Sequence, residues 1–170
     1  FLRTWLRDTW IADIRNRMRA RQELDRWRRA GRTIPPPHAF KQYVVRHLAR
    51  EFAPPNFVET GTMHGDMVAA MLGTFNKLYS IELDPVFAEL ARKRFARFPR
   101  VCIISGDSSF VLPAILGKLQ QPALFWLDGH YSGPGTAGSD YPSPLMTELS
   151  HILAHGISNH VIVIDDLREL

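Results

Sequence analysis

The sequence predicts an α/β protein with a doubly wound, mostly parallel sheet, preceded by an N-terminal helical extension. Three observations lead to this prediction. From residue 57 onward, five short runs rich in β-branched and aromatic residues alternate with helix-like segments, a pattern typical of parallel strands joined by crossover helices. The runs are apolar nearly throughout, which indicates strands buried on both faces. Residues 1–38 differ from the rest in the spacing of their apolar residues and in their net charge.

Residues 1–38 are predicted to form a basic amphipathic helix followed by a proline-rich linker. One apolar stripe recurs every four residues, as a helix face requires: Leu2, Leu6, Trp10, Ile14 and Met18. The segment GRTIPPPH ends this helix, because Gly31 can cap it and three prolines cannot continue it. The apolar stripe needs a packing partner, and a second subunit is our expectation, which would make the protein a homo-oligomer.

The positive charge of the chain belongs to this leading segment. Residues 1–32 hold ten arginines and four acidic residues, a net charge of +6, whereas the remaining 138 residues carry −2. A local excess of this kind weakens any inference from the overall charge of +4 to nucleic-acid binding.

Residues 39–170 are predicted to form the second domain. A helix over 39–52 is stopped by a Pro-Pro pair, after which strands are expected at 57–61, 77–84, 100–107, 122–129 and 160–166. Helices are expected between and after them, at 65–74, 85–98, 109–119 and 145–155. The remaining long connection, 131–144, is rich in glycine and proline, and we expect it to face the substrate.

Length and composition limit the class of protein. A chain of 170 residues with 45% apolar residues can bury a substantial core. No apolar run approaches the ~20 residues that span a bilayer, and the charged N-terminus lacks the apolar stretch of a signal peptide. The single cysteine, Cys102, excludes an internal disulfide and fits a reducing compartment. We therefore expect a cytoplasmic protein. Since the chain starts without methionine and stops just after an apolar run, we also expect it to be a fragment or a chain trimmed to its ordered part.

Every predicted strand ends in an acidic residue: Glu59, Glu82 with Asp84, Asp107, Asp128, and Asp165 with Asp166. In open parallel sheets, ligands bind beyond the carboxyl ends of the strands. One such acid is ordinary, because strand-end turns favour aspartate. Acids at all five strand ends predict a binding site.

The segment ETGTMHGD, residues 59–66, narrows the choice of ligand. A phosphate-binding P-loop needs a lysine where Asp66 follows Gly65, and a dinucleotide loop needs a glycine where Met63 stands. These substitutions favour a ligand that carries positive charge and hydroxyls but no phosphate. S-adenosylmethionine is such a ligand. Its cationic groups suit Glu59, its ribose diol suits a carboxylate 23 residues later at position 82, and its adenine amine suits the acid at position 107.

Residues 54–168 resemble the class I, Rossmann-like S-adenosylmethionine-dependent methyltransferases. ETGTMHG is similar to their first motif, SIELDP to the second and ISGDS to the third. The resemblance implies a Rossmann-like fold whose last two strands are missing from this chain. It also implies a set of cofactor-binding residues: Glu59, Gly61, Thr62, Gly65, Glu82, Asp107, Ser108 and Asp128.

The later motifs are similar to those of metal-dependent O-methyltransferases of the catechol and macrolide-sugar types. FWLDGHYSG followed by VIVIDD implies that Asp128, Asp165 and Asp166 hold Mg²⁺, for which carboxylates are suitable ligands. The lysine that catechol-type enzymes place three residues after the first of these acids is Tyr131 here. We therefore expect His130 as general base, with Asp128 as the second catalytic residue. The predicted activity is O-methylation of a small hydroxylated, sugar-like or catechol-like acceptor.

Other interpretations of the same residues stay open. The two glycines could serve only a tight turn, and Asp165 and Asp166 could cap a following helix. The fold could have been kept as a binding or assembly module. A nucleic-acid methyltransferase would use the arginine-rich helix, but the fourth strand lacks the Asn/Asp-Pro-Pro-aromatic signature of amino-methylating enzymes, so we do not expect a nucleic-acid partner. A nicotinamide-dependent oxidoreductase is disfavoured by Met63.

Overall fold

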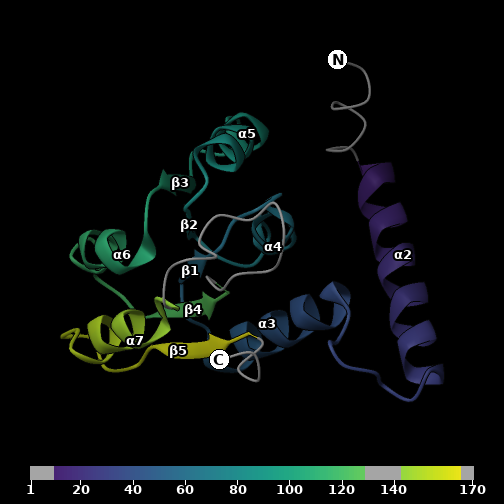
Figure 1. Cartoon of the computed structure of the whole chain (residues 1–170). Coiled ribbons are helices and arrows are strands. Elements are labelled where there is room, and N and C mark those ends of the chain that lie inside the picture. The colour runs from purple at the N-terminus through teal and green to yellow at the C-terminus, as the bar shows by residue number, and fades with distance from the viewer. Residues whose placement is uncertain (1–9, 129–142, 166–170) are drawn as a thin grey trace. The chain divides into compact units, whose positions relative to one another are not determined.

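A computed structural model describes residues 10–128 and 143–165, with side chains from Met18 onward (Figure 1). Two of the predicted site residues, His130 and Asp166, lie outside these ranges, as does most of the 131–144 connection. The chain divides into two compact units, Phe1–Val44 and Val45–Leu170. No helix in the described part of the chain is long and apolar enough to cross a membrane.

The first unit contains the basic helix α2 (Trp10–Arg29) and the start of α3 (His38–Phe52). The helix α2 ends where Gly31 takes a φ of 81°, the left-handed conformation predicted for its cap. The linker is tied down by Trp27, whose indole N–H donates to the carbonyl of Thr33 at 2.7 Å. The same indole packs on Phe40 with ring centroids 4.8 Å apart. The linker thus returns the chain onto the end of α2.

The second unit is built on a five-stranded parallel sheet, which confirms the predicted fold class (Figure 1). Its strands are β1 (Asn56–Thr60), β2 (Lys77–Glu82), β3 (Val101–Ser105), β4 (Ala123–Leu127) and β5 (Val161–Ile164), in the spatial order β3-β2-β1-β4-β5. The chain moves outward from β1 to β3 and then returns to β4 beside β1. The topological switch point therefore lies between β1 and β4.

Four further helices complete the layers: α4 (Asp66–Met71), α5 (Pro85–Phe95), α6 (Ser108–Leu116) and α7 (Leu145–Leu153). Figure 1 shows α6 and α7 on one side of the sheet and α4 and α5 on the other. The core is accordingly double. Phe57 packs with α4, α5 and the second half of α3, whereas its neighbour Val58 packs with α6 and α7. Successive strand residues point to opposite faces. Because helices cover both faces, Phe57 and Val58 are both fully buried.

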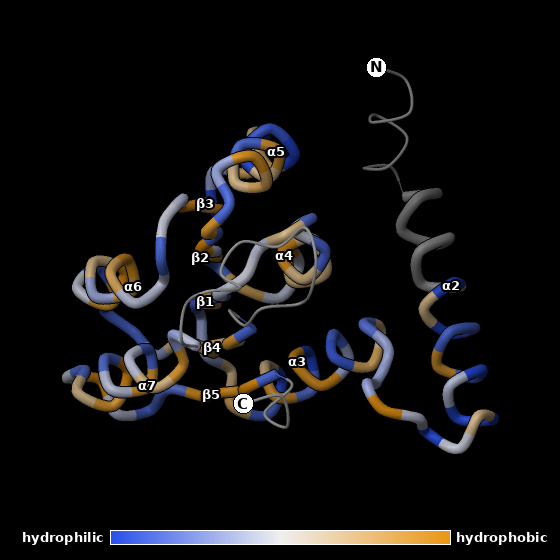
Figure 2. Tube along the Cα trace, in the orientation of Figure 1, coloured by the Kyte–Doolittle hydropathy of each residue, from blue (hydrophilic) through white to orange (hydrophobic). Residues whose placement is uncertain are grey.

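Hydropathy follows these layers. In Figure 2 the strands β3 and β5 are mostly hydrophobic, and α5 and α7 carry hydrophobic residues on one side and hydrophilic residues on the other. Burial on both faces explains why these two strands do not alternate with polar residues.

The helix α3 ends at Phe52 as predicted, whereas α4, α5, α6 and α7 stop two or three residues before their predicted ends. The last turns of the first three of these show why. The amide of Thr74 donates to the carbonyl of Met71, and the amide of Phe98 to that of Phe95, at 2.9 and 2.8 Å. Both bonds span three residues rather than four, which tightens the chain out of the α-helix. The amide of Lys118 makes the same bond to Ile115 after α6. Because the apolar periodicity continues into these turns, it overestimates the lengths of the helices.

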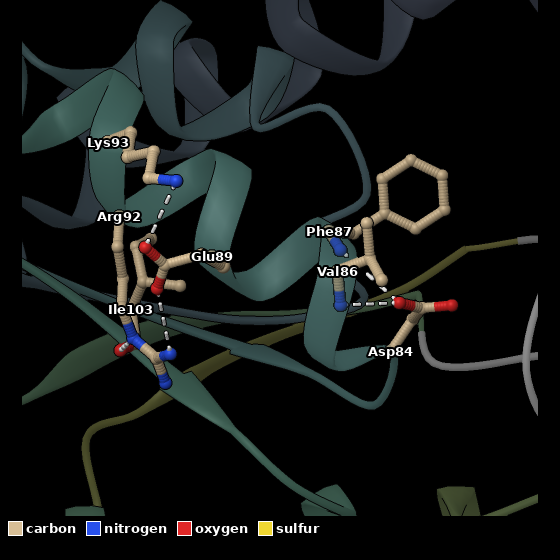
Figure 3. A network of polar contacts seen from close by, with 7 residues as sticks. All are labelled: Asp84, Val86, Phe87, Glu89, Arg92, Lys93 and Ile103. Atoms are coloured by element: carbon tan, nitrogen blue, oxygen red, sulfur yellow. Dashed lines mark hydrogen bonds and ion pairs between the residues drawn. The ribbon is translucent and has the colours of Figure 1, made fainter.

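Asp84 begins α5, and a contact at the other end of the helix ties it to the sheet (Figure 3). The carboxylate of Asp84 accepts hydrogen bonds from the amides of Val86 at 2.7 Å and Phe87 at 3.3 Å. Further along the helix, Arg92 Nε donates to the carbonyl of Ile103 on β3 at 3.3 Å. The helix is thereby fixed against the sheet, with its last turn near the loop that follows β1.

Candidate cofactor site

Strand register brings two of the predicted acids, Asp128 and Asp165, to the same edge of the sheet. Leu127 at the end of β4 pairs with Thr60 on one side and with Ile164 on the other. The next residues continue this pairing, because the amide of Asp128 donates to the carbonyl of Thr60 at 3.1 Å and that of Asp165 to the carbonyl of Leu127 at 2.9 Å. Asp128 and Asp165 are therefore neighbours, and Asp128 lies beside the switch point between β1 and β4, where ligands of such sheets bind.

The loop after β1 is a strained turn. Gly61, Met63 and Gly65 have φ of 87°, 46° and 74°, all in the left-handed region, which is uncommon for a residue such as methionine. A Cβ at position 65 would lie 2.6 Å from Cε2 of Phe95. The glycine is thus required both by the backbone conformation and by close contact with α5.

Glu82 is held in one orientation by two backbone amides. Its Oε2 accepts from the amide of Met63 at 2.6 Å, and its Oε1 accepts from the amide of Asp84 at 3.0 Å. The side chain is 8% exposed. Each carboxylate oxygen can accept a further hydrogen bond, so the group can receive two hydroxyls at once. The bond to Met63 also fixes the strained loop to the end of β2.

Glu59 is the buried acid of the site, 2% exposed. Its Oε2 accepts from the hydroxyl of Ser80 at 2.5 Å, and the hydroxyls of Ser80 and Thr62 are 2.6 Å apart. When Glu59 is charged, the hydroxyl of Ser80 must donate its single proton to the carboxylate. The hydroxyl of Thr62 is then the donor in its hydrogen bond with Ser80. The hydroxyl of Thr62 is thus used within the protein rather than pointed at a ligand.

Burial raises the pKa of Glu59 well above its ordinary value. The hydrogen bond from Ser80 opposes this shift, and the negative charges of Asp128, Glu82 and Asp66 add to it. A group of carboxylates around a buried acid creates a negative potential. The site therefore favours a cation.

Ser80 and Arg94 belong to the site but were not predicted from the sequence. Ser80 lies two residues before Glu82, so a strand periodicity of two places both on one face, but nothing local marks it as a partner of Glu59. Arg94 on α5 donates through Nη1 to the carbonyl of His64 and to Oδ1 of Asp66, the latter at 2.7 Å. This contact, the Arg94 latch, joins Arg94 to His64 and Asp66, which lie 30 and 28 positions earlier in the chain.

The third strand supplies Asp107 and Ser108. Asp107 Oδ1 accepts from the amide of Ser109 at 2.8 Å, which makes Asp107 the N-cap of α6. Ser108 is 8% exposed and lies beside the buried Glu148 of α7, another residue that the sequence did not single out.

The predicted metal ligands are only partly described. Asp128 is half-buried and Asp165 is 9% exposed. Within residues 10–128 and 143–165, no three His, Cys, Asp or Glu side chains are grouped so that they could hold a metal ion. The third predicted ligand, Asp166, and the predicted base, His130, lie outside the described residues. The metal site stays a prediction.

Comparison with known proteins identifies the fold. The sequence matches no protein-family model and no curated protein. Among solved structures, the chain is similar to the S-adenosylhomocysteine-bound methyltransferase PaMTH1 of Podospora anserina, with a TM-score of 0.58 and 17% identity over 92% of this chain and 70% of that one. A proposed caffeoyl-CoA O-methyltransferase of Staphylococcus aureus gives 0.53 and 12% over 92% and 71%. The O-methyltransferase TomG of Streptomyces achromogenes, solved with S-adenosylmethionine, gives 0.50 and 20% over 77% and 59%.

The chain has the fold of the class I methyltransferases. It spans between 59% and 71% of the lengths of these three proteins. In the methyltransferase fold of this chain, Glu59, Gly61, Gly65 and Glu82 meet around one loop. Asp128 follows the strand next to that loop.

Proposed function

We propose that the chain binds S-adenosylmethionine at the switch point and transfers its methyl group to an oxygen of a small hydroxylated acceptor. The observation that carries this proposal is the pair of acids at the strained loop. Glu59 is buried within negative charge, and Glu82 is held by two backbone amides. The pair suits a ligand with a cation and a diol. The likeness in fold to methyltransferases supports the same choice.

Each part of the ligand is assigned to one group. Glu59 and the loop of Gly61 and Gly65 face the amino group and the sulfonium. Glu82 accepts from both ribose hydroxyls, since each of its oxygens has a lone pair left. Asp107, which follows β3, accepts from the adenine amine, and Ser108 lies next to it at the start of α6.

The reaction is an in-line displacement. The acceptor oxygen attacks the methyl carbon, the C–O bond forms, and the electrons of the C–S bond stay on sulfur, so that the cofactor leaves as a neutral thioether. The proton of the acceptor hydroxyl passes to a base, for which His130 is our candidate. Asp128, Asp165 and Asp166 would hold Mg²⁺, which when bound would lower the pKa of an acceptor hydroxyl. Neighbouring hydroxyls suit such a site, so a sugar-like or catechol-like diol is the proposed acceptor.

Calorimetric titration tests the cofactor assignment. We expect micromolar binding of S-adenosylhomocysteine and none of NAD, and weaker binding in Glu82→Gln, which keeps the size of the side chain but loses one acceptor oxygen. Wild-type protein that binds neither ligand would contradict the proposal and favour a binding or assembly module.

A methyl-transfer assay with diol acceptors tests the metal. Activity is expected to need added Mg²⁺ and to fall sharply in Asp128→Asn. Full activity of Asp128→Asn without metal would show that the metal assignment is wrong, while leaving the cofactor assignment intact.

A further inference from the structure

Ser80 is a buried serine to which the proposed function assigns no part of the ligand. It lies on β2 as the register partner of Glu59 on β1, so the two side chains project next to each other from one face of the sheet. The hydroxyl of Ser80 donates to Oε2 of Glu59 at 2.5 Å. Neither residue is more than 2% exposed, so this bond is shielded from solvent.

Thr62 extends this contact into the loop after β1. Its hydroxyl is 2.6 Å from that of Ser80, and the residue is 3% exposed. The loop backbone fixes its place, because its carbonyl accepts from the amide of Gly65 at 2.7 Å and its amide donates to the carbonyl of Ile81 at 3.3 Å. Thr62, Ser80 and Glu59 thus form one buried series of hydrogen bonds, the hydroxyl chain.

The direction of the hydroxyl chain depends on the charge of Glu59. A carboxylate can only accept, so with Glu59 charged each hydroxyl donates toward it and both protons have an acceptor. Protonation at Oε2 would make Glu59 the donor, which would turn both hydroxyls around and deprive the Thr62 proton of Ser80 as its acceptor. The hydroxyl chain therefore stabilises the charged form of the acid. Buried hydrogen bonds in series also strengthen one another.

The other surroundings of Glu59 oppose its charge. Burial raises the pKa of Glu59, and the hydrogen bond from Ser80 opposes that shift. Three carboxylates on separate segments raise the pKa further: Asp128 after β4, Glu82 on β2 and Asp66 on α4. Of these influences, only the bond from Ser80 favours the carboxylate.

We propose that Ser80 is a positioning residue, which together with Thr62 keeps Glu59 in its charged form for the cation of the cofactor. The part of the cation rests on the proposed function, whereas the effect on Glu59 itself does not. Thr62 lies between Gly61 and Met63, the first two residues of the strained turn. The conformation of the loop and the charge of the acid are therefore coupled, since moving Thr62 away from Ser80 weakens the hydroxyl chain.

The first measurement follows the ionisation of Glu59 in the ligand-free full chain, by the NMR chemical shift of its isotopically labelled carboxyl carbon against pH. Ser80→Ala should move the titration midpoint to higher pH. Thr62→Val should move it in the same direction by less, and Thr62→Ser, which keeps the hydroxyl, should stay closer to wild type. Ser150→Ala is the control, because it removes an exposed hydroxyl that donates to the carbonyl of Met146 at 2.7 Å. It should leave the midpoint unchanged.

The second measurement is the affinity for S-adenosylhomocysteine between pH 5 and pH 8, by calorimetry. The ammonium group of this ligand favours the charged acid, so affinity should fall as pH falls through the midpoint of Glu59. In Ser80→Ala this fall should begin at higher pH, with a loss of about tenfold where wild type is still charged, as expected for one hydrogen bond to a charged group. In the Glu59→Gln background, Ser80→Ala should add no shift with pH, because the titrating group is gone.

An unchanged midpoint of Glu59 in Ser80→Ala, or in Thr62→Val if Ser80→Ala does not fold, would overturn the proposal. So would a loss of affinity that is equal at every pH or equally large in the Glu59→Gln background, since a merely structural effect behaves in that way. If the midpoint moves as expected but the wild type does not bind S-adenosylhomocysteine, the proposed function fails and the positioning role stands.

Discussion

Glu59 lies at a position where the charged form of its carboxyl group is disfavoured. Burial raises its pKa, and the carboxylates of Asp128, Glu82 and Asp66 raise it further. Groups perturbed in this way are concentrated at functional sites, where the charge of a ligand compensates. The structure requires a glycine at position 65, because both the positive φ and the close approach of Phe95 oppose a side chain there.

Replacing Glu59 by glutamine should stabilise the protein at high pH. A carboxyl whose folded pKa is raised contributes stability that is present below its unfolded pKa, about 4.3, and is lost as pH rises through the folded pKa. Glu59→Gln removes this loss. Urea denaturation should therefore show the variant more stable than wild type at pH 8 and little different at pH 4, with weaker binding of S-adenosylhomocysteine. Glu51→Gln, at an exposed position, is the control. An equal pH dependence in wild type and Glu59→Gln would refute the assignment.

Gly65→Ala should lower the free energy of unfolding by about 1–3 kcal/mol, because the positive φ and the contact with Phe95 both oppose a Cβ. Gly73→Ala is the matched control, since a Cβ there meets nothing within 4 Å. Thermal or denaturant unfolding of both variants makes the comparison. Equal stability of the two would mean that the loop adapts to a side chain.

At the scale of elements, α5 connects the loop after β1 with the outer strands. Asp84 sets its start, Arg92 holds it to β3, and Arg94 near its end binds the loop carbonyl of His64 and the side chain of Asp66. One helix thus fixes the position of the loop that carries Gly65.

Arg94→Ala should weaken binding of S-adenosylhomocysteine about three- to tenfold, since charge-assisted hydrogen bonds are worth more than neutral ones but this side chain is partly exposed. Stability should change little. Lys93→Ala, which removes a surface ion pair with Glu89, should bind like wild type. Calorimetric titration of wild type, Arg94→Ala and Lys93→Ala with S-adenosylhomocysteine tests this prediction. Unchanged affinity in Arg94→Ala would mean that the loop keeps its conformation without the Arg94 latch.

At the scale of the whole molecule, charge and core belong to different parts of the chain. The arginines gather in the leading segment, and α2 ends with Arg26, Arg28 and Arg29 in its last turn. The double core of the sheet draws on α3 only from Val45 onward. The described residues of both core clusters all lie in the second unit, Val45–Leu170.

Deleting residues 1–37 should leave binding of S-adenosylhomocysteine unchanged within about twofold and keep a cooperative unfolding transition. The nucleic-acid alternative is tested by the same pair of proteins. If the arginines bind RNA, the full chain should show salt-dependent affinity that the shortened chain lacks. Loss of ligand binding on deletion would show that the leading segment contributes to the site.

Much of the fold could be predicted because its signals are local. Apolar runs buried on both faces predicted five parallel strands, and the acids that follow them predicted a candidate site at the carboxyl ends of these strands. Helix ends were less accurate, since apolar periodicity runs on into the tightened turns after Met71 and Phe95.

The sequence by itself determined the alternation of strands and helices, the turn glycines, and the acids Glu59, Glu82 and Asp128 at strand ends. Only the tertiary structure decided their partners: the hydroxyl of Ser80 for Glu59, the amide of Met63 for Glu82, and the hydroxyl of Thr60 for the amide of Asp128. The reason is physical. Period and burial are recorded along the chain, residue by residue, whereas a hydrogen bond between segments depends on strand order and register, which bring together residues far apart in the sequence.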